Sequence, residues 1–139
     1  MSRTYPMNGP VARTLELVGE RWTLLILLEI LKGSHRFADI NGSLVGISPN
    51  LLSTRLKSLE ENGVVERRFY SSHPPRAEYI LTSKGHELGI VAGALAVWGS
   101  KYLADDISLL HSRCGERVDV IYYCDKCSGR VKRSQVKLS

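Results

Sequence analysis

The sequence predicts a mainly α-helical domain that carries one small β-hairpin. Three observations indicate this fold class. Apolar residues recur at helical spacing between residues 10 and 62, a capped helix starts at Ser48-Pro49 directly after a glycine-containing turn, and two segments rich in β-branched and aromatic residues follow. With 139 residues the chain is long enough for one such domain with appendages, and too short for two domains of ordinary size.

Two helices are expected at the start of the domain. Pro10 suits the first turn of a helix, and apolar residues follow it at three- and four-residue spacing up to Gly19. The next helix, residues 22–31, is apolar on nearly every side and ends before Lys32-Gly33. We therefore expect this second helix to be buried in the middle of the domain.

A helix-turn-helix is predicted next. Phe37, Ile40 and Leu44 share one face of a third helix, and residues 45–47 then form a tight turn around a glycine. Ser48 is an N-cap residue followed by proline at the first helical position, so a fourth helix begins there and runs to residues 62–63. Two helices joined by a short turn that contains glycine are typical of this motif.

The fourth helix has one apolar and one polar side. Leu52, Leu56 and Leu59 fall on the side that faces the core, and small polar residues with one lysine fall on the other. Short polar side chains can approach base edges in a major groove. The alternative is that this side is only the solvated face of an amphipathic helix. The candidate DNA-binding residues on this helix are Ser48, Asn50, Ser53, Thr54, Arg55 and Lys57, with Arg55 assigned to phosphates.

The two segments after Gly63 are predicted to form a hairpin. Residues 64–70 and 76–81 are the expected strands, and the polar residues 71–75, with two prolines, are the expected tip. A helix-turn-helix followed by such a hairpin is the winged helix-turn-helix arrangement. In that arrangement the second helix enters the major groove and the hairpin tip contacts the DNA backbone or the minor groove.

Basic side chains on the hairpin are further candidates for DNA contact. Arg67, His73 and Arg76 are predicted to bind DNA, with Arg76 on phosphates and His73 at the tip of the wing. Adjacent residues of a strand point to opposite faces, so only one of Arg67 and Arg68 can easily reach phosphates. The alternative is that these arginines are ordinary exposed strand residues balanced by neighbouring glutamates.

The last helix is expected to contribute to a dimer. Thr82-Ser83 can cap it, and residues 88–98 are almost wholly apolar. A monomer would leave much of that surface exposed, so the helix is predicted to pack against a second subunit. The predicted interface residues, on the first and last helices, are Val11, Leu15, Leu88, Val91, Leu95 and Trp98.

These elements divide the chain into an N-terminal arm (1–8), a DNA-binding and dimerisation domain (9–104) and a basic, cysteine-containing appendage (105–139). The appendage is expected to hold two short strands, 118–123 and 130–136, around a turn. The net charge of +5 is weak evidence for a polyanion partner, because the appendage holds more of the surplus than the helix-turn-helix. No signal peptide or membrane span is evident, so we expect a cytoplasmic protein with reduced cysteines and no membrane partner.

Several segments together resemble the HxlR-type transcriptional regulators. They include residues 9–27 (GPVARTLELVGERWTLLIL), 46–49 (GISP), 52–60 (LSTRLKSLE) and 75–82 (PRAEYILT), within a match that covers about residues 9–103. The resemblance implies a winged-helix fold, a homodimer built from terminal helices, and promoter binding as a repressor or activator. Oxidant-sensing members of that family carry a cysteine where this chain has Gly9, so the common redox switch cannot operate at that position.

The appendage contains potential metal ligands. His111-x2-Cys114 and Cys124-x2-Cys127 offer one imidazole and three thiols at the spacing typical of zinc sites. A structural Zn²⁺ would stabilise an appendage that has little core of its own. The alternatives are three free thiols or a thiol redox site. No cofactor is otherwise indicated.

Taken together, the residues predict a sequence-specific DNA-binding transcription regulator that binds a pseudo-palindromic double-stranded site as a homodimer. No phosphate-binding loop, nucleophile elbow or paired catalytic carboxylate is present, so we expect no enzyme activity. The alternatives are a winged helix used for contact with protein or RNA, and a zinc-ribbon scaffold with little DNA specificity. No pattern in the sequence specifies an effector.

Overall fold

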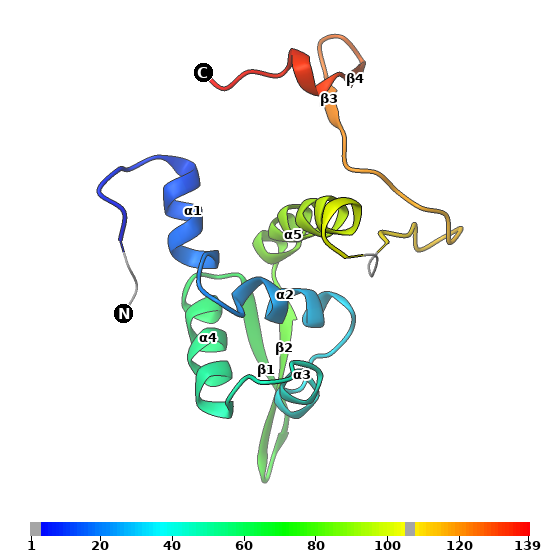
Figure 1. Cartoon of the computed structure of the whole chain (residues 1–139). Coiled ribbons are helices and arrows are strands. Elements are labelled where there is room, and N and C mark those ends of the chain that lie inside the picture. Colours follow the sequence, from blue (N-terminus) through cyan, green and yellow to red (C-terminus); the bar gives the residue numbers. More distant parts are fainter. Residues whose placement is uncertain (1–3, 105–107) are drawn as a thin grey trace. The chain divides into compact units, whose positions relative to one another are not determined.

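The computed structural model describes residues 4–104 and 108–139. The chain forms two compact units, Met1–Ala92 and Gly93–Ser139, and the boundary between them falls within the last long helix. The first unit contains four helices, a β-hairpin and the start of a fifth helix (Figure 1). These elements confirm the predicted fold class of a mainly α-helical domain with a small hairpin.

The helices of the first unit are α1 (Pro10–Val18), α2 (Thr23–Leu31), α3 (Phe37–Ser43) and α4 (Pro49–Glu61). Their core is made of aliphatic side chains that solvent hardly reaches, among them Ile26, Leu27, Ile40, Leu52, Leu56 and Leu59. The apolar side of α4 therefore faces the core as predicted. The prediction that α2 is buried on all sides was wrong, because Leu25 and Leu31 are exposed. The helix carries apolar side chains on nearly every side, but only one side packs on the core.

The turn between α3 and α4 has the predicted geometry. Gly46 has a φ of +96°, a left-handed conformation that glycine adopts without strain, and it lies against the Trp22 ring. The Ser48 hydroxyl oxygen then accepts a hydrogen bond from the Leu51 N–H (3.2 Å), and Pro49 occupies the first turn of α4. The start of α4 is thus fixed by its own cap.

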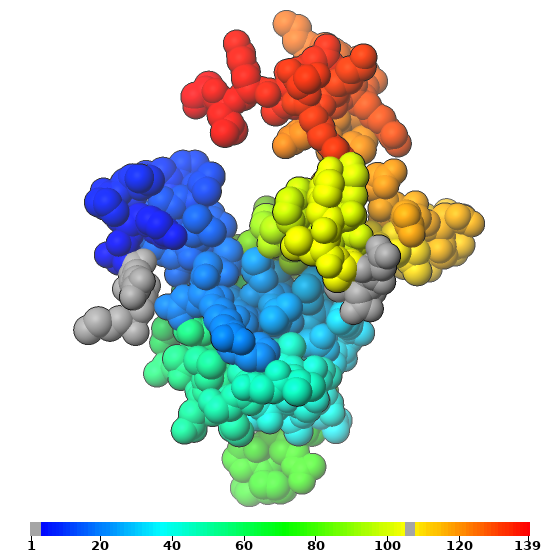
Figure 2. Space-filling view, viewed as in Figure 1, coloured from blue at the N-terminus to red at the C-terminus, as the bar shows by residue number. Residues whose placement is uncertain are grey.

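Strands β1 (Val65–Ser72) and β2 (Pro75–Leu81) form the antiparallel hairpin. The predicted tip of residues 71–75 was too long: Ser72 pairs with Pro75, so only His73 and Pro74 separate the strands. Pro75 can begin a strand because the missing N–H of proline is tolerated at the first residue of a strand. The hairpin reaches beyond the helices of its own unit, and its tip forms a separate lobe of the surface (Figure 2).

A short segment before α3 adds a third element to the hairpin. The Tyr79 N–H donates to the His35 carbonyl oxygen (2.7 Å), and Arg36 and Glu78 form an isolated β-bridge. No periodic pattern in the sequence predicts this pairing. It attaches the base of the hairpin to the helix-turn-helix.

Helix α5 (Ser83–Tyr102) begins with the predicted cap, in which the Thr82 hydroxyl accepts a hydrogen bond from the Gly85 N–H (3.1 Å). A Cβ at Gly85 would collide with the Val64 carbonyl oxygen, so this close approach requires glycine. No helix of the described residues is long and apolar enough to span a membrane.

The second unit contains the end of α5, strands β3 (Tyr122–Cys124) and β4 (Gly129–Val131), and the 3-10 helix η1 (Arg133–Gln135). The predicted strands 118–123 and 130–136 were wrong in extent. Residues 118–121 form no strand, and the second predicted strand ends early because the chain turns at Lys132, whose carbonyl oxygen accepts from the Gln135 N–H (2.8 Å). The predicted turn at 124–129 is present.

Candidate nucleic-acid interface

The polar side of α4 lies open to solvent. Asn50, Thr54 and Lys57 are exposed on the side of the helix opposite its buried leucines, and Ser53 is exposed on one flank. The cap at Ser48 and the core contacts hold the helix rigidly, so these side chains are presented at fixed positions. These four are the residues predicted for groove contacts.

Some of the candidate side chains already form hydrogen bonds within the protein, and others do not. The Ser48 oxygen caps the helix, and the Thr54 hydroxyl donates to the Asn50 carbonyl oxygen one turn earlier (2.9 Å). The side chains of Asn50, Ser53 and Lys57 form no hydrogen bond or ion pair with another described residue. Asn50, Ser53 and Lys57 therefore keep their full capacity to bind a ligand.

Arg55 has an intramolecular partner that the sequence did not reveal. Its guanidinium forms an ion pair with the Glu20 carboxylate, and its Nε donates to the Arg21 carbonyl oxygen (3.4 Å). Both side chains are partly shielded from solvent. Arg55 thus fastens α4 to the corner between α1 and α2, and its charge is already neutralised there. Glu20 lies far from Arg55 in sequence, and no local pattern predicts the pair.

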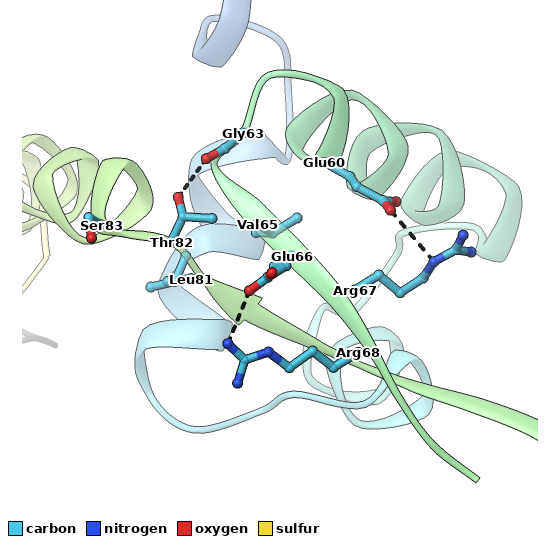
Figure 3. A pocket seen from close by; sticks show the side chains of 9 residues that line it. All are labelled: Glu60, Gly63, Val65, Glu66, Arg67, Arg68, Leu81, Thr82 and Ser83. Carbon is cyan, nitrogen blue, oxygen red and sulfur yellow. Dashed lines mark hydrogen bonds and ion pairs between the residues drawn. The ribbon is translucent and has the colours of Figure 1, made fainter. Parts of the chain in front are cut away.

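Arg67 and Arg68 also have acidic partners, on opposite sides of β1 (Figure 3). Arg67 Nε lies 3.7 Å from Glu60 Oε1 of α4, and Arg68 donates to Glu66 (3.1 Å). The four residues line an open hollow of about 600 Å³, together with Gly63, Val65, Leu81, Thr82 and Ser83. Exposed ion pairs of this kind contribute little to stability.

The free charge on the hairpin lies near its tip. Arg76 is exposed and forms no ion pair with a described residue, and His73 is exposed with its ring nitrogen 3.2 Å from the Ser72 hydroxyl. Two aromatic residues of β1 are also exposed, Phe69 under the Arg67 guanidinium and Tyr70 under that of Arg36. Neither aromatic was predicted to be exposed, because alternation alone does not show which side of a hairpin is covered.

Apolar side chains are exposed on α1 and along α5. Val11 and Leu15 are exposed on α1, and Val91, Leu95 and Trp98 are exposed on α5. Leu88, the sixth residue of the predicted interface, packs partly against the core of the first unit instead. Tyr102, which was not predicted, continues the stripe, since positions 91, 95, 98 and 102 follow one face of a helix.

The potential metal ligands of the C-terminal appendage, whose described residues 108–139 are called the tail from here on, form two pairs. His111 Nδ1 lies 3.1 Å from Cys114 Sγ, and a main-chain hydrogen bond from Cys127, together with the Cys127 side chain, lowers the pKa of the Cys124 thiol. Within residues 4–104 and 108–139, no three histidine, cysteine or acidic side chains gather closely enough to hold a metal. All three cysteines are free thiols.

Comparison with known proteins agrees with this geometry. The chain is 43% identical over 130 residues to Rv3095, an uncharacterised HTH-type transcriptional regulator of Mycobacterium tuberculosis, covering 91% of this chain and 82% of the relative. It is 37% identical over 89 residues to the regulator YtfH of Escherichia coli, covering 64% and 71% of the two chains. The reduced form of the transcriptional regulator YodB from B. subtilis superposes with a TM-score of 0.59 at 32% identity, over 73% of this chain and all of that one.

A second solved structure, PA1607, named as a candidate transcription factor, has a TM-score of 0.80 at 27% identity over 96% of both chains. The family model that matches is the HxlR-like helix-turn-helix, over residues 17–107, which include the whole helix-turn-helix, the hairpin and α5. The chain therefore belongs to the HxlR-like helix-turn-helix family and is a DNA-binding transcriptional regulator.

Proposed function

We propose that this regulator binds a pseudo-palindromic DNA site as a homodimer, with α4 of each subunit in a major groove. The observation that carries the proposal is the exposed polar face of α4, where Asn50, Ser53 and Lys57 have no partner within the described chain. Arg55, predicted to contact phosphate, is assigned instead to positioning this helix, because Glu20 already pairs with its charge. An amide, a hydroxyl and an ammonium group on one rigid face suit the donors and acceptors of base edges.

The hairpin supplies the second contact. Because its tip extends past the helices of its unit, it can follow the DNA backbone or enter the minor groove beside the site of α4 (Figure 2). Arg76 is the free cation on this wing and is assigned to phosphates, with His73 beside it at the tip. Arg67 joins them only if a phosphate displaces Glu60, since the present ion pair occupies its charge.

The apolar stripe of α5 is the proposed dimer contact. Trp98 is 56% exposed and Leu95 is 53% exposed, although both are apolar and lie on one face of the helix. Burying such a stripe against its copy removes apolar surface from water, which favours association. Val11 and Leu15 of α1 are exposed as well and are assigned to the dimer contact. In the dimer the two α4 helices would lie about 34 Å apart, in successive major grooves.

A salt titration of DNA binding tests this function. The full-length protein would be titrated onto the duplex upstream of its own gene and onto a random duplex, alongside Asn50→Ala and Lys57→Ala. Tight, salt-dependent binding with preference for the upstream duplex, weakened in both variants, is expected.

The matched controls are Asn8→Ala and Lys32→Ala, which remove the same side-chain types outside the proposed interface. They should bind like the wild type. Equal, weak binding of both duplexes at low salt would contradict the proposal and favour a role in protein contact.

A further inference from the structure

The tail contains two turns built to the same plan. In each, two ligand-type residues stand three positions apart, His111 with Cys114 and Cys124 with Cys127. In each, the residue directly after the second ligand has a positive φ, +76° for Gly115 and +50° for Ser128. Two antiparallel chain segments flank each turn, through an isolated bridge in the first and through β3 and β4 in the second.

The backbone of each turn reverses the chain between its two ligand-type residues. In the first turn the Gly115 N–H donates to the His111 carbonyl oxygen (2.8 Å), and the imidazole Nδ1 lies 3.1 Å from the Cys114 sulfur. In the second turn Cys124 pairs with Gly129 across the two strands, and the Ser128 N–H donates to the Asp125 carbonyl oxygen (3.2 Å), so the chain reverses between the two cysteines. Each turn thus places two ligand-type residues at the reversal of the chain.

The tail has ordered turns but no core to stabilise them. None of the residues 108–139 is buried, and apolar side chains such as Leu110, Ile121 and Tyr123 are exposed. A segment of this length rarely keeps a structure without a disulfide, a metal or a partner. Of these three stabilisers, a metal is the one for which the tail contains suitable ligands.

We propose that His111, Cys114, Cys124 and Cys127 together bind one structural Zn²⁺ in tetrahedral geometry. The connector between the turns includes residues 119–121, which form no strand or helix, so it can bend to bring the two pairs together. Since no three of these side chains gather closely in the described part of the tail, binding is coupled to closure of the tail, and the coordinating thiols release their protons to solvent. One nitrogen and three sulfur ligands match the preference of Zn²⁺ in closed structural sites.

Metal analysis of the full-length protein tests this proposal. The reduced protein, loaded with Zn²⁺ and then dialysed without chelator, should retain about one zinc per chain. Replacing Zn²⁺ by Co²⁺ should produce the visible absorption of a tetrahedral site and a thiolate-to-cobalt band. His111→Ala, Cys114→Ser, Cys124→Ser and Cys127→Ser should each lose most of the metal.

Two further variants make the assignment specific. His111→Cys should retain zinc, because a thiolate can take the place of the imidazole, whereas His86→Ala, an exposed histidine outside the tail, should leave the zinc content unchanged. Helical circular dichroism of each variant should match that of the wild type, since the helical core lies in the first unit.

Three results would overturn the proposal. Less than about one zinc per two chains, with three thiols titratable by a thiol reagent, would mean that the tail is a free-thiol segment. A Cys124–Cys127 disulfide that persists in the purified protein would assign the second turn to redox chemistry. Zinc retained in both His111→Ala and Cys114→Ser would mean that the second turn binds metal without the first, between two chains. The DNA-binding function stands whichever result is obtained.

Discussion

Arg55 on α4 pairs with Glu20, which lies in the corner between α1 and α2. Its Nε also donates to the Arg21 carbonyl oxygen (3.4 Å), so one guanidinium joins the DNA-facing helix to the end of α1. Since α1 carries part of the proposed dimer surface, this contact relates the position of α4 to that of the interface. Arg55 had been predicted to bind phosphate, and its partners instead indicate a positioning role.

The pair should contribute to stability. Arg55→Ala is expected to lower the free energy of unfolding by about 1–2 kcal/mol, because it leaves a partly shielded carboxylate and a carbonyl oxygen without their donor. Urea unfolding measures this. A double-mutant cycle with Glu20→Ala should give a coupling of at least about 0.5 kcal/mol. If Arg55→Ala left the unfolding free energy unchanged and only weakened DNA binding, the phosphate role would be correct.

Asn50→Ala should change which base is preferred at one position of each half-site. An amide that makes two hydrogen bonds to a base edge discriminates by about 1–3 kcal/mol. Binding to a set of single-base variants of the operator measures the preference. Uniform weakening over all those duplexes would show that Asn50 touches the backbone and not a base.

Arg76→Ala should weaken binding to every duplex by a similar factor. A phosphate contact carries no sequence information, and its loss should reduce the slope of log K against log salt by about 1. Affinities measured at several salt concentrations give the slope. Arg68→Ala is the matched control, because Arg68 is paired with Glu66 and is not assigned to DNA. An unchanged slope in Arg76→Ala would remove this residue from the interface.

Leu95→Arg should shift the protein from dimer to monomer. The substitution places a charge in the middle of the apolar stripe of α5, where it would be buried against the partner without a counter-charge. Sedimentation equilibrium measures the molecular mass. Leu138→Arg is the control, since Leu138 is 98% exposed and lies outside the stripe. A dimer that survives Leu95→Arg would place the interface elsewhere.

Gly85→Ala should destabilise the first unit by about 1–3 kcal/mol, since the added methyl group meets the Val64 carbonyl oxygen at the junction of β1 and α5. Thermal unfolding measures the loss. Gly99→Ala, on the same helix with open space around its Cα, should not destabilise the protein. Equal stability of the two variants would mean that the backbones at Gly85 and Val64 are less closely packed than described.

Local chemistry made the helix-turn-helix and the hairpin predictable. Ser48-Pro49 specifies its helix start through a cap and a fixed φ, and the apolar spacing of α4 specifies the face that is buried. The strands were predicted from β-branched and aromatic content, but their length was not, because Pro75 can pair at the end of a ladder.

Contacts between distant residues could not be predicted in the same way. The partner of Arg55 depends on how α1 and α2 meet, and the pairing of His35 with Tyr79 depends on where the hairpin docks. The two sides of α2 look alike in sequence, so only tertiary packing decides that Leu25 is exposed and Ile26 is buried. Among equivalent polar residues of α4, the structure separates those that are free from those already bonded.

Protection of guanine N7 from methylation on the operator tests most directly whether two α4 helices read DNA together. The proposed homodimer should protect two major-groove patches whose centres lie about 10 base pairs apart, on one face of the duplex, and Asn50→Ala should weaken the protection in both. A single protected patch, or protection that is the same on a random duplex, would contradict binding of a pseudo-palindrome by two recognition helices.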